Sequence, residues 1–272
     1  MNFASIALCA GLMGACTLPV RAAEPESPPP AGDKIEGAVG LVLSYEPTFS
    51  GSSEFRVKPH LAGFLRYGRI TVSGAGGFTT KRQEDVERGL DAELLRRQNL
   101  RVDLALRFDG GRKQSDSALL DGMGDIRSTL RARLGLRWDV APRWQVSAAT
   151  SVDALNRVGG FVVDLGLSHT LPIDPRQRLI LGVAATAASE RYSQAWYGVT
   201  PAQSLASGYP VFSAREGLRG VSAGATWRIE IDPQWAAFAG GSTSYLLGSA
   251  AASPLTRQRA GWSLSAGVAR RF

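Results

Sequence analysis

The stretch that decides the fold is IRSTLRARLGLRWD, residues 126–139, in which apolar and charged side chains alternate. The even positions from Ile126 to Trp138 are mostly apolar. The odd positions carry four arginines: Arg127, Arg131, Arg133 and Arg137. Successive side chains of a β-strand point to opposite faces, so a period of two separates an apolar face from a charged face. A helix would scatter the same arginines around its surface, and the stretch is therefore predicted to be a strand.

The segment 99–109 repeats this pattern, and the rest of the chain after residue 35 extends it. The alternation predicts twelve strands, at residues 36–46, 54–67, 69–80, 88–97, 99–109, 126–139, 143–154, 160–171, 177–189, 217–231, 234–247 and 260–272. Most of them exceed the roughly five or six residues usual in soluble sheets and suit a tilted membrane crossing of about 9–11. The ranges 69–80 and 88–97 have the weakest pattern, so ten strands remain an alternative.

The connections between these strands alternate in length along the whole chain. The short ones are Gly68, Gln98, 140–142, 172–175 and 232–233, and the long ones are 47–53, 81–87, 110–125, 155–159, 190–216 and 248–259. Outer-membrane barrels have short turns on the periplasmic side and long loops outside. The fold class predicted is an all-β, transmembrane, antiparallel up-and-down β-barrel, residues 36–272, with both termini in the periplasm. The longest loop, 190–216, is predicted to be either a folded cap or a binding surface.

Aromatic residues gather at the predicted strand ends. Trp138 and Trp144 flank one short turn, and Trp227 and Trp235 flank another. The opposite strand ends carry Tyr45, Phe78, Phe108, Phe161 and Tyr245. Two aromatic belts are typical of the two membrane–water interfaces. The chain ends on Phe272, which is similar to the C-terminal signal that the outer-membrane assembly machinery reads, although Arg270 on the same face departs from that signal.

The N-terminal residues are predicted to be removed from the mature protein. Residues 1–22 have the apolar core and the small residues before a cleavage site that are typical of a signal peptide, with lipid attachment at Cys16 as an alternative. Their removal takes away both cysteines of the chain, which excludes disulfides and thiolate metal sites. Residues 23–35 then form a flexible Pro-rich leader. The mean hydropathy of −0.06 excludes a bundle of membrane helices.

Charged residues lie at the inward positions of three neighbouring strands. They are Asp91, Glu93, Arg97, Arg101, Asp103, Arg107, Arg127, Arg131, Arg133 and Arg137. One interpretation is an arginine-lined path for anions. The other, which the interleaved acidic residues favour, is a network of ion pairs that fills the lumen, since buried charges need partners.

The residues offer little for catalysis. The two histidines are His60 and His169, and Ser168 precedes His169 on a strand, so their side chains point to opposite faces and cannot pair. No phosphate loop, HExxH motif or calcium loop occurs in the sequence. We predict no enzymatic activity, no catalytic residue, no cofactor and no metal. The basic residues are spread over the lumen side, which does not suggest a nucleic-acid partner.

Four segments resemble the MipA/OmpV family of outer-membrane proteins. They are PTFSGS at 47–52, LDGMGDI at 120–126, WYGVT at 196–200 and SPL at 253–255. The third contains Trp196, Tyr197, Gly198 and Val199, with Trp-Tyr where the family has Tyr-Phe. Their order along the chain matches the family, and the resemblance covers essentially the whole mature region.

The resemblance implies a non-catalytic scaffold that holds a lytic transglycosylase next to a murein synthase at the outer membrane. It also leaves two other functions open: a small-solute channel with an arginine-lined lumen, and a surface adhesin or antigen. The expected partners are outer-membrane lipid, lipopolysaccharide and the assembly machinery, with the two murein enzymes as further candidates. The protein is expected to be a monomer.

Overall fold

The structure, a computed structural model, describes residues 35–74 and 89–272. Its twelve strands are β1 (Glu36–Pro47), β2 (Phe55–Tyr67), β3 (Ile70–Ser73), β4 (Gly89–Arg96), β5 (Leu100–Asp109), β6 (Thr129–Ala141), β7 (Trp144–Asp153), β8 (Phe161–Asp174), β9 (Gln177–Ala188), β10 (Gly217–Glu230), β11 (Trp235–Leu246) and β12 (Ala260–Arg271). The predicted signal peptide, residues 1–22, and residues 23–34 of the predicted leader lie outside the described residues.

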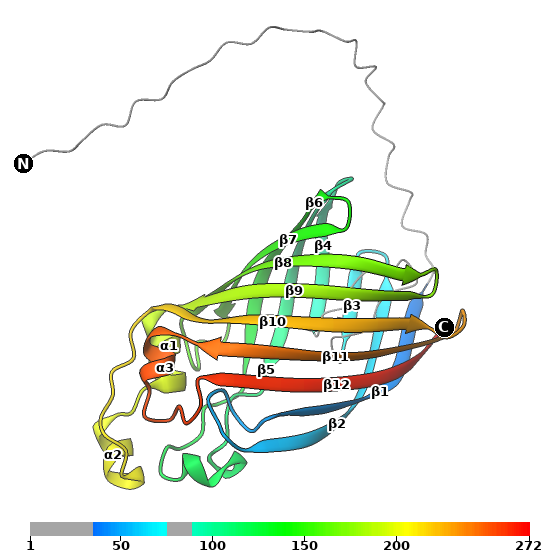
Figure 1. Ribbon diagram of the computed structural model, residues 1–272. Helices are drawn as coiled ribbons and strands as arrows, with labels where there is room; N and C mark the ends of the chain where they lie inside the picture. The colour runs from blue at the N-terminus through cyan, green and yellow to red at the C-terminus, as the bar shows by residue number, and fades with distance from the viewer. Residues whose placement is uncertain (1–34, 75–88) are drawn as a thin grey trace, which may run out of the picture. The chain divides into compact units, whose positions relative to one another are not determined.

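The strands form a closed antiparallel barrel in which each strand pairs with its neighbours along the chain (Figure 1). β1 pairs with β12, from Ala38 opposite Arg271 to Tyr45 opposite Leu264, and this pairing closes the barrel. The predicted fold class, an all-β up-and-down barrel of about twelve strands, is confirmed. Among the described residues, the helices are all too short and too polar to cross a membrane.

The alternation of side chains puts the apolar face outside. On β5, Leu104 is 45% exposed and Leu106 is 40% exposed. The alternate residues Asp103 and Ala105 are only 7% and 1% exposed. A closed barrel satisfies its backbone hydrogen bonds internally, so an apolar outer surface is compatible with lipid. Arg131, Arg133 and Arg137 of β6 accordingly turn toward the lumen.

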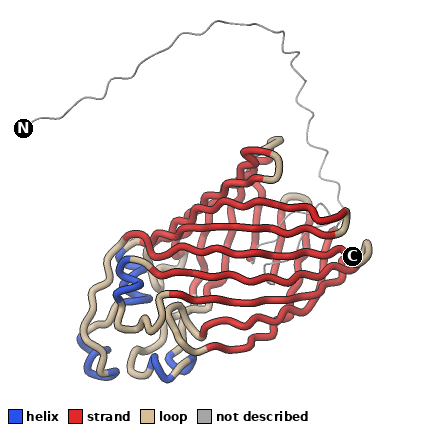
Figure 2. Tube along the Cα trace, in the orientation of Figure 1, coloured by secondary structure: helices blue, strands red, loops and turns tan. Residues whose placement is uncertain are grey.

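The two ends of the barrel differ, as Figure 2 shows. At one end, here called the turn end, β8 and β9 are joined by Pro175 and Arg176 alone, and Phe272 exchanges backbone hydrogen bonds with Gly37. At the other, the loop end, the long connections fold into helices and turns. The alternation of short and long links that the sequence predicted therefore gives the barrel two unlike ends.

Some strand bounds differ from the prediction. β6 begins at Thr129 because the backbone of Ile126 bonds to Arg112, outside the ladder between β5 and β6. β8 continues to Asp174, with a register shift after Pro172, so the predicted turn at 172–175 is shorter. Of the predicted strand 69–80, residues 70–73 form β3, and residues 75–80 lie outside the described residues.

Exposed aromatic side chains lie at both ends of the strands. At the turn end they are Tyr67, Trp138, Trp144, Trp227 and Trp235, and at the loop end they are Tyr45, Phe108, Phe161, Tyr245 and Trp262. Tyr45, Phe55 and Trp262 form a cluster with ring centroids 4.8–5.4 Å apart. This arrangement agrees with two interfacial belts, except that Phe78 lies outside the described residues.

The lumen has an apolar wall as well as a charged one. Phe64 and Phe238 are buried inside the barrel among small side chains of β1, β2 and β12. Gly267 on β12 makes room for Phe238, since a Cβ at this position would lie 2.5 Å from its ring. Ion pairs of the lumen join β5, β6 and β8, and a further one joins Arg271 of β12 to Glu230 of β10.

Candidate functional site

Four loops at the loop end fold together into a structure that we call the loop cap, residues 48–54, 110–128, 190–216 and 248–259. It contains α1 (Glu190–Tyr197), α2 (Pro201–Ser207), α3 (Gly248–Ala252) and the 3-10 helices η1 (Gln114–Asp116) and η2 (Ala118–Leu120). Each of the four segments that resemble the family lies wholly or mostly in this cap. The sequence left open whether 190–216 is a cap or a binding surface, and the structure shows a folded element.

Tyr197, at the end of α1, joins three of these loops. Its hydroxyl donates to Ser50 Oγ at 3.1 Å, and its carbonyl accepts from Ser253 Oγ at 2.6 Å. Ser253 also accepts from the backbone N–H of Leu255 at 3.2 Å, and the serine is almost fully buried. Val199 packs with Leu255 in a small apolar cluster. The motif residues are thus brought together as parts of one packed core.

The second half of the 190–216 loop binds the 110–128 loop. Gln203 in α2 donates from Nε2 to the carbonyl of Met123 at 2.7 Å. Tyr209 donates its hydroxyl to the carbonyl of Leu119 at 3.0 Å and accepts from Arg257 at 3.0 Å. Trp196, in contrast, packs partly buried against two apolar clusters of the cap.

A buried arginine joins two loops of the loop cap, 110–128 and 190–216. Arg112 is 4% exposed and donates from Nη1 to the carbonyl of Trp196 at 2.9 Å. Burial lowers the pKa of Arg112 below its usual value, while the neighbouring Tyr197 and Asp116 oppose the shift. The hydrogen bond from the buried guanidinium of Arg112 to the carbonyl of Trp196 thus holds α1 close to the 110–128 loop.

The cap also reaches the charged wall of the lumen through Tyr192 of α1. The guanidinium of Arg131 lies 4.8 Å from the centre of the Tyr192 ring, and that of Arg219 lies 5.7 Å away. Arg219 also donates to the Tyr192 hydroxyl at 3.2 Å. Burial raises the pKa of Tyr192 above its usual value, and the neighbouring Arg219 opposes the shift. Cation–π contacts of this kind hold α1 against the barrel wall.

Most of the predicted lumen residues form ion pairs. Arg131 Nε lies 2.8 Å from Asp109 Oδ2, Arg137 Nη2 lies 2.9 Å from Asp103 Oδ1, and Arg133 Nη1 lies 2.9 Å from Asp164 Oδ2. Arg101 approaches Asp139 at 4.0 Å, and Arg107 lies directly opposite Arg131 across the two strands. Asp91 is opposite Ala105, and its Oδ2 accepts no hydrogen bond from the described residues.

Two of the predicted lumen residues lie elsewhere. A register shift after Glu93 reverses the alternation in β4, so that Arg96, and not Arg97, pairs with Arg101 and donates to Glu93 at 2.9 Å. Arg97 lies beyond β4 and is exposed. Arg127 precedes β6 and is exposed as well. Alternation alone could not reveal this register shift, since Leu94 and Leu95 are both apolar and either one continues the pattern.

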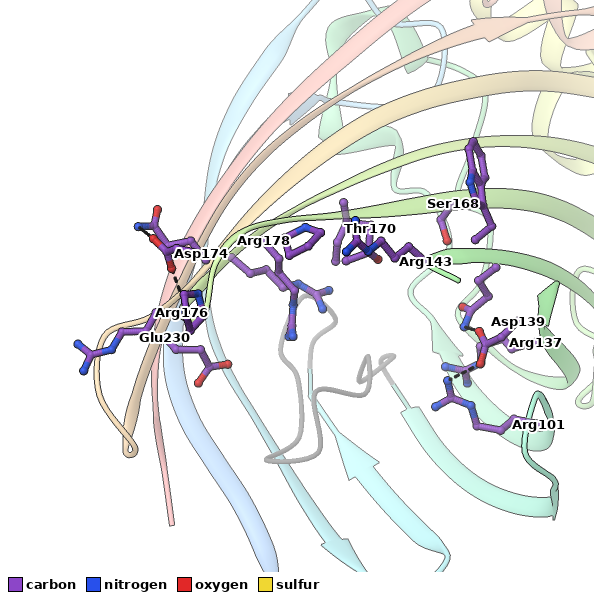
Figure 3. Close-up of a pocket in the computed structure, with 17 residues that line it drawn as sticks. Arg101, Arg137, Asp139, Arg143, Ser168, Thr170, Asp174, Arg176, Arg178 and Glu230 are labelled. Carbon is purple, nitrogen blue, oxygen red and sulfur yellow. Dashed lines mark hydrogen bonds and ion pairs between the residues drawn. The ribbon is translucent and has the colours of Figure 1, made fainter. Parts of the chain in front are cut away.

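A cavity of about 500 Å³ opens at the turn end of the lumen, and we call it the vestibule (Figure 3). Its walls come from β5 to β10 and from the turns between them. Six arginines line it: Arg101, Arg137, Arg143, Arg176, Arg178 and Arg228. Three carboxylates accompany them: Asp139, Asp174 and Glu230. From this set only Arg101 and Arg137 were predicted lumen residues, although Arg178 and Arg228 also fall at inward positions of their strands.

The histidine that follows Ser168 takes no part in this cavity. Ser168 lines the vestibule, whereas the ring of His169 lies 4.2 Å from that of Trp144, its partner across the strands on the outer face. This separation is the one that the alternation predicted for a serine and a histidine adjacent in a strand. The arrangement provides cations and hydrogen-bond donors but no activated nucleophile at Ser168.

Solved structures of similar architecture include three outer-membrane proteins. The NanC porin aligns with a TM-score of 0.44 at 8% identity, over 85% of this chain and 98% of that one. The KdgM porin has a TM-score of 0.41 at 7% identity, over 86% and 99%. An outer membrane channel from Pseudomonas putida has a TM-score of 0.42 at 14% identity, over 88% and 95%. Likeness at this level says nothing about ligands or partners.

Sequence comparison gives the family. No curated protein matches the chain. The family described as MltA-interacting protein MipA matches residues 39–272, which is nearly all of the barrel, including the loop cap and its four motif segments. The resemblance that those segments indicated is confirmed, and the chain belongs to the MltA-interacting protein MipA family.

Proposed function

We propose that this protein is a non-catalytic scaffold of the outer membrane that holds a lytic transglycosylase next to a murein synthase. The observation that carries the proposal is the family match over residues 39–272, because the family description names MltA as an interaction partner. The ordered loop cap and the paired lumen charges support a role that depends on a rigid body and not on transport.

In this proposal the turn end faces the periplasm, where murein lies. Short periplasmic turns and long outer loops are the rule for barrels of this kind, and the described chain begins and ends at the turn end. The partners would then contact the turns, together with the Pro-rich leader 23–35. A leader of this composition can extend toward a partner without a packed core of its own.

A channel for small anions is the second candidate. The specific observation in its favour is the excess of arginine over carboxylate around the vestibule. Against it, the arginines farther along the lumen are paired with carboxylates, and Arg131 and Arg219 contact Tyr192 of the loop cap. We therefore rank the scaffold first.

Affinity capture tests the scaffold directly. The tagged protein is recovered from gently solubilised envelopes, washed at high salt, and its companions are identified by mass spectrometry. We expect specific enrichment of a lytic transglycosylase or a murein synthase over the amount recovered with an unrelated barrel carrying the same tag. Recovery of lipopolysaccharide and assembly factors alone would overturn the scaffold and favour the channel.

A further inference from the structure

The outer face of the barrel is hollowed across β7 to β12, the strands that lie side by side in Figure 1. An apolar groove of about 710 Å³ crosses all six of them. Among its lining residues, Leu165, Val183 and Val221 are exposed. Ala185 pairs with Val221 and Ala223 pairs with Val183, and each alanine has a single side-chain carbon, so the surface is lower there. The groove therefore lies on the lipid-facing side of the strands, outside the lumen.

The groove extends through much of the depth of the barrel. Its lining starts at Ala260 and Tyr245, which are paired at the loop end of β12 and β11, and it reaches Val146 near the turn end of β7. Strands of outer-membrane barrels are tilted about 35–45° from the barrel axis, so a line across neighbouring strands also descends through the bilayer. The groove thus has the direction and the apolar lining that an extended acyl chain requires.

Three basic residues lie beside the loop end of the groove. Arg259 immediately precedes Ala260, and Arg257 lies two residues earlier. Both arginines are exposed, and the connection between β11 and β12 contains no Asp or Glu. Arg215 is also exposed, and its backbone N–H donates to Ser249 Oγ of that connection at 2.9 Å. The mouth of the groove at the loop end is therefore bordered by cations.

These cations are not neutralised by the protein. Among the described residues, no carboxylate forms an ion pair with Arg215, Arg257 or Arg259. Arg257 donates to the hydroxyl of Tyr209 at 3.0 Å, and its guanidinium lies 5.4 Å from the centre of that ring. This partner is neutral, so it holds the guanidinium in place and leaves its charge. Glu216, which follows Arg215 in the chain, offsets one charge of the three.

Aromatic side chains indicate the depth of these arginines in the membrane. Tyr245 lines the groove, and Trp262 is the next exposed residue of β12 after Ala260. Both belong to the aromatic belt at the loop end, and such belts lie at the level of the lipid head groups. Arg259 lies on the loop side of both rings, at the depth of head-group phosphates. An apolar groove and cations that suit phosphate thus meet at one interface.

We propose that the groove and the three arginines form a binding site for a phosphorylated glycolipid of the outer leaflet, the lipid A part of lipopolysaccharide. Its acyl chains fill the groove, and its phosphates are bound by guanidinium groups, whose planar forks bind phosphate oxygens with two parallel hydrogen bonds. The site rests on the orientation proposed above, in which the loop end faces outward. It does not depend on the murein enzymes or on conduction.

Native mass spectrometry of the full mature protein in detergent, titrated with lipid A that carries two phosphates, tests the site. We expect one lipid to bind saturably, with an affinity roughly tenfold or more above that of the same lipid without phosphates, because the charge-assisted hydrogen bonds are then lost. Equal affinity for the two lipids would show that acyl chains alone are bound and would overturn the proposal. The absence of saturable binding would overturn it as well.

Two variants test the two parts of the site. R215Q/R259Q removes two charges whose side chains have no partner among the described residues, and A223F fills the groove with a bulky side chain. Each should weaken binding of lipid A roughly tenfold. The matched controls are R69Q/R270Q at exposed positions of the turn end and A239F at an exposed position of β11 outside the groove. Folding is checked by circular dichroism. Equal losses in variants and controls would overturn the site.

Two further readouts separate this proposal from its alternatives. A dimer that persists without added lipid and dissociates in A223F would assign the groove to a second copy of the chain and contradict the proposal. Binding in detergent does not depend on orientation, which is measured separately by labelling S213C with a membrane-impermeant maleimide. Labelling on intact cells supports the site, whereas labelling only after lysis would place the loop end in the periplasm and overturn a site in the outer leaflet.

Discussion

At the scale of single residues, packing inside this protein depends on a few positions where another side chain would clash or leave backbone groups without hydrogen bonds. Gly40 on β1 faces β12 so closely that a Cβ would lie 2.2 Å from the carbonyl oxygen of Val268. Ser253 satisfies two backbone groups of the loop cap in a nearly water-free position. The role of each residue follows from its contacts, and substitution of each residue tests that role.

Replacing Gly40 with alanine should hinder closure of the barrel. The added methyl group must push β1 away from β12, and overpacking of this kind costs about 1–3 kcal/mol. The measurement is the urea midpoint of unfolding, together with the folded fraction. The control is G182A on β9, where a Cβ would have no neighbour closer than 3.8 Å. A G40A barrel as stable as G182A would contradict the expectation.

Replacing Ser253 with alanine should loosen the loop cap and leave the strands intact. The change leaves the N–H of Leu255 and the carbonyl of Tyr197 without the hydrogen bonds of the serine hydroxyl. Each unsatisfied buried group lowers the stability of the fold by about 1–3 kcal/mol. Amide hydrogen exchange at Leu255 should accelerate roughly tenfold or more. S213A, at an exposed serine of the 190–216 loop, serves as control. Unchanged exchange in S253A would show that the cap does not depend on this bond.

At the scale of elements, the 190–216 loop organises the others. α1 contacts the lumen through Tyr192, and α2 binds the 110–128 loop through Gln203. Thr200 caps α2 by accepting from the N–H of Gln203, whose side chain accepts from Thr200 in return, so the helix begins in a locally defined way. Short helices have little stability of their own, and their order here comes from contacts between loops.

Exchanging residues 190–216 for a short turn should therefore disorder a loop that it does not include. Residues 117–125 lose the hydrogen bonds from Gln203 and Tyr209, so their amide protection should fall, while protection of β5 and β6 stays. The comparison is hydrogen exchange of the two proteins under the same conditions. Retained protection at Met123 would mean that the 110–128 loop orders itself independently.

At the scale of the whole molecule, the barrel combines an apolar exterior with an interior divided between apolar and charged walls. Along the charged wall, carboxylates and arginines form ion pairs, and the lining of the vestibule contains six arginines and three carboxylates. The loop cap covers the other end of this wall with Tyr192. The two ends of the lumen therefore differ: the loop cap contacts the charged wall at the loop end, and the vestibule opens at the turn end.

This division predicts that the intact protein shows no steady conductance in planar bilayers. We expect the paired charges and the loop cap to obstruct the lumen between the vestibule and the loop end. Single-channel recording checks the prediction, with a known porin as the positive control. Steady anion-selective current whose selectivity R131E reverses would establish the channel and contradict the scaffold proposal.

Much of the fold could be predicted because alternation is local. Twelve strands follow from a period of two, and their described bounds agree within a few residues, apart from the predicted strand 69–80, of which residues 75–80 lie outside the described residues. The inward positions of Arg131, Arg133 and Arg137 were predicted in the same way, whereas Arg127 precedes β6 and is exposed. Arg97 was misplaced because a single extra residue reverses the alternation and leaves no trace in composition.

The sequence by itself determined the barrel, its apolar exterior, its unlike ends and, through four motifs, its family. Each of these rests on neighbours along the chain or on patterns that repeat. Only the tertiary structure decided which charges meet, that the four motifs form one loop cap, and that Arg178 and Arg228 share a cavity with Arg101 and Arg137. The reason is physical: these contacts join strands and loops far apart in the chain, and closure of the barrel alone brings them together.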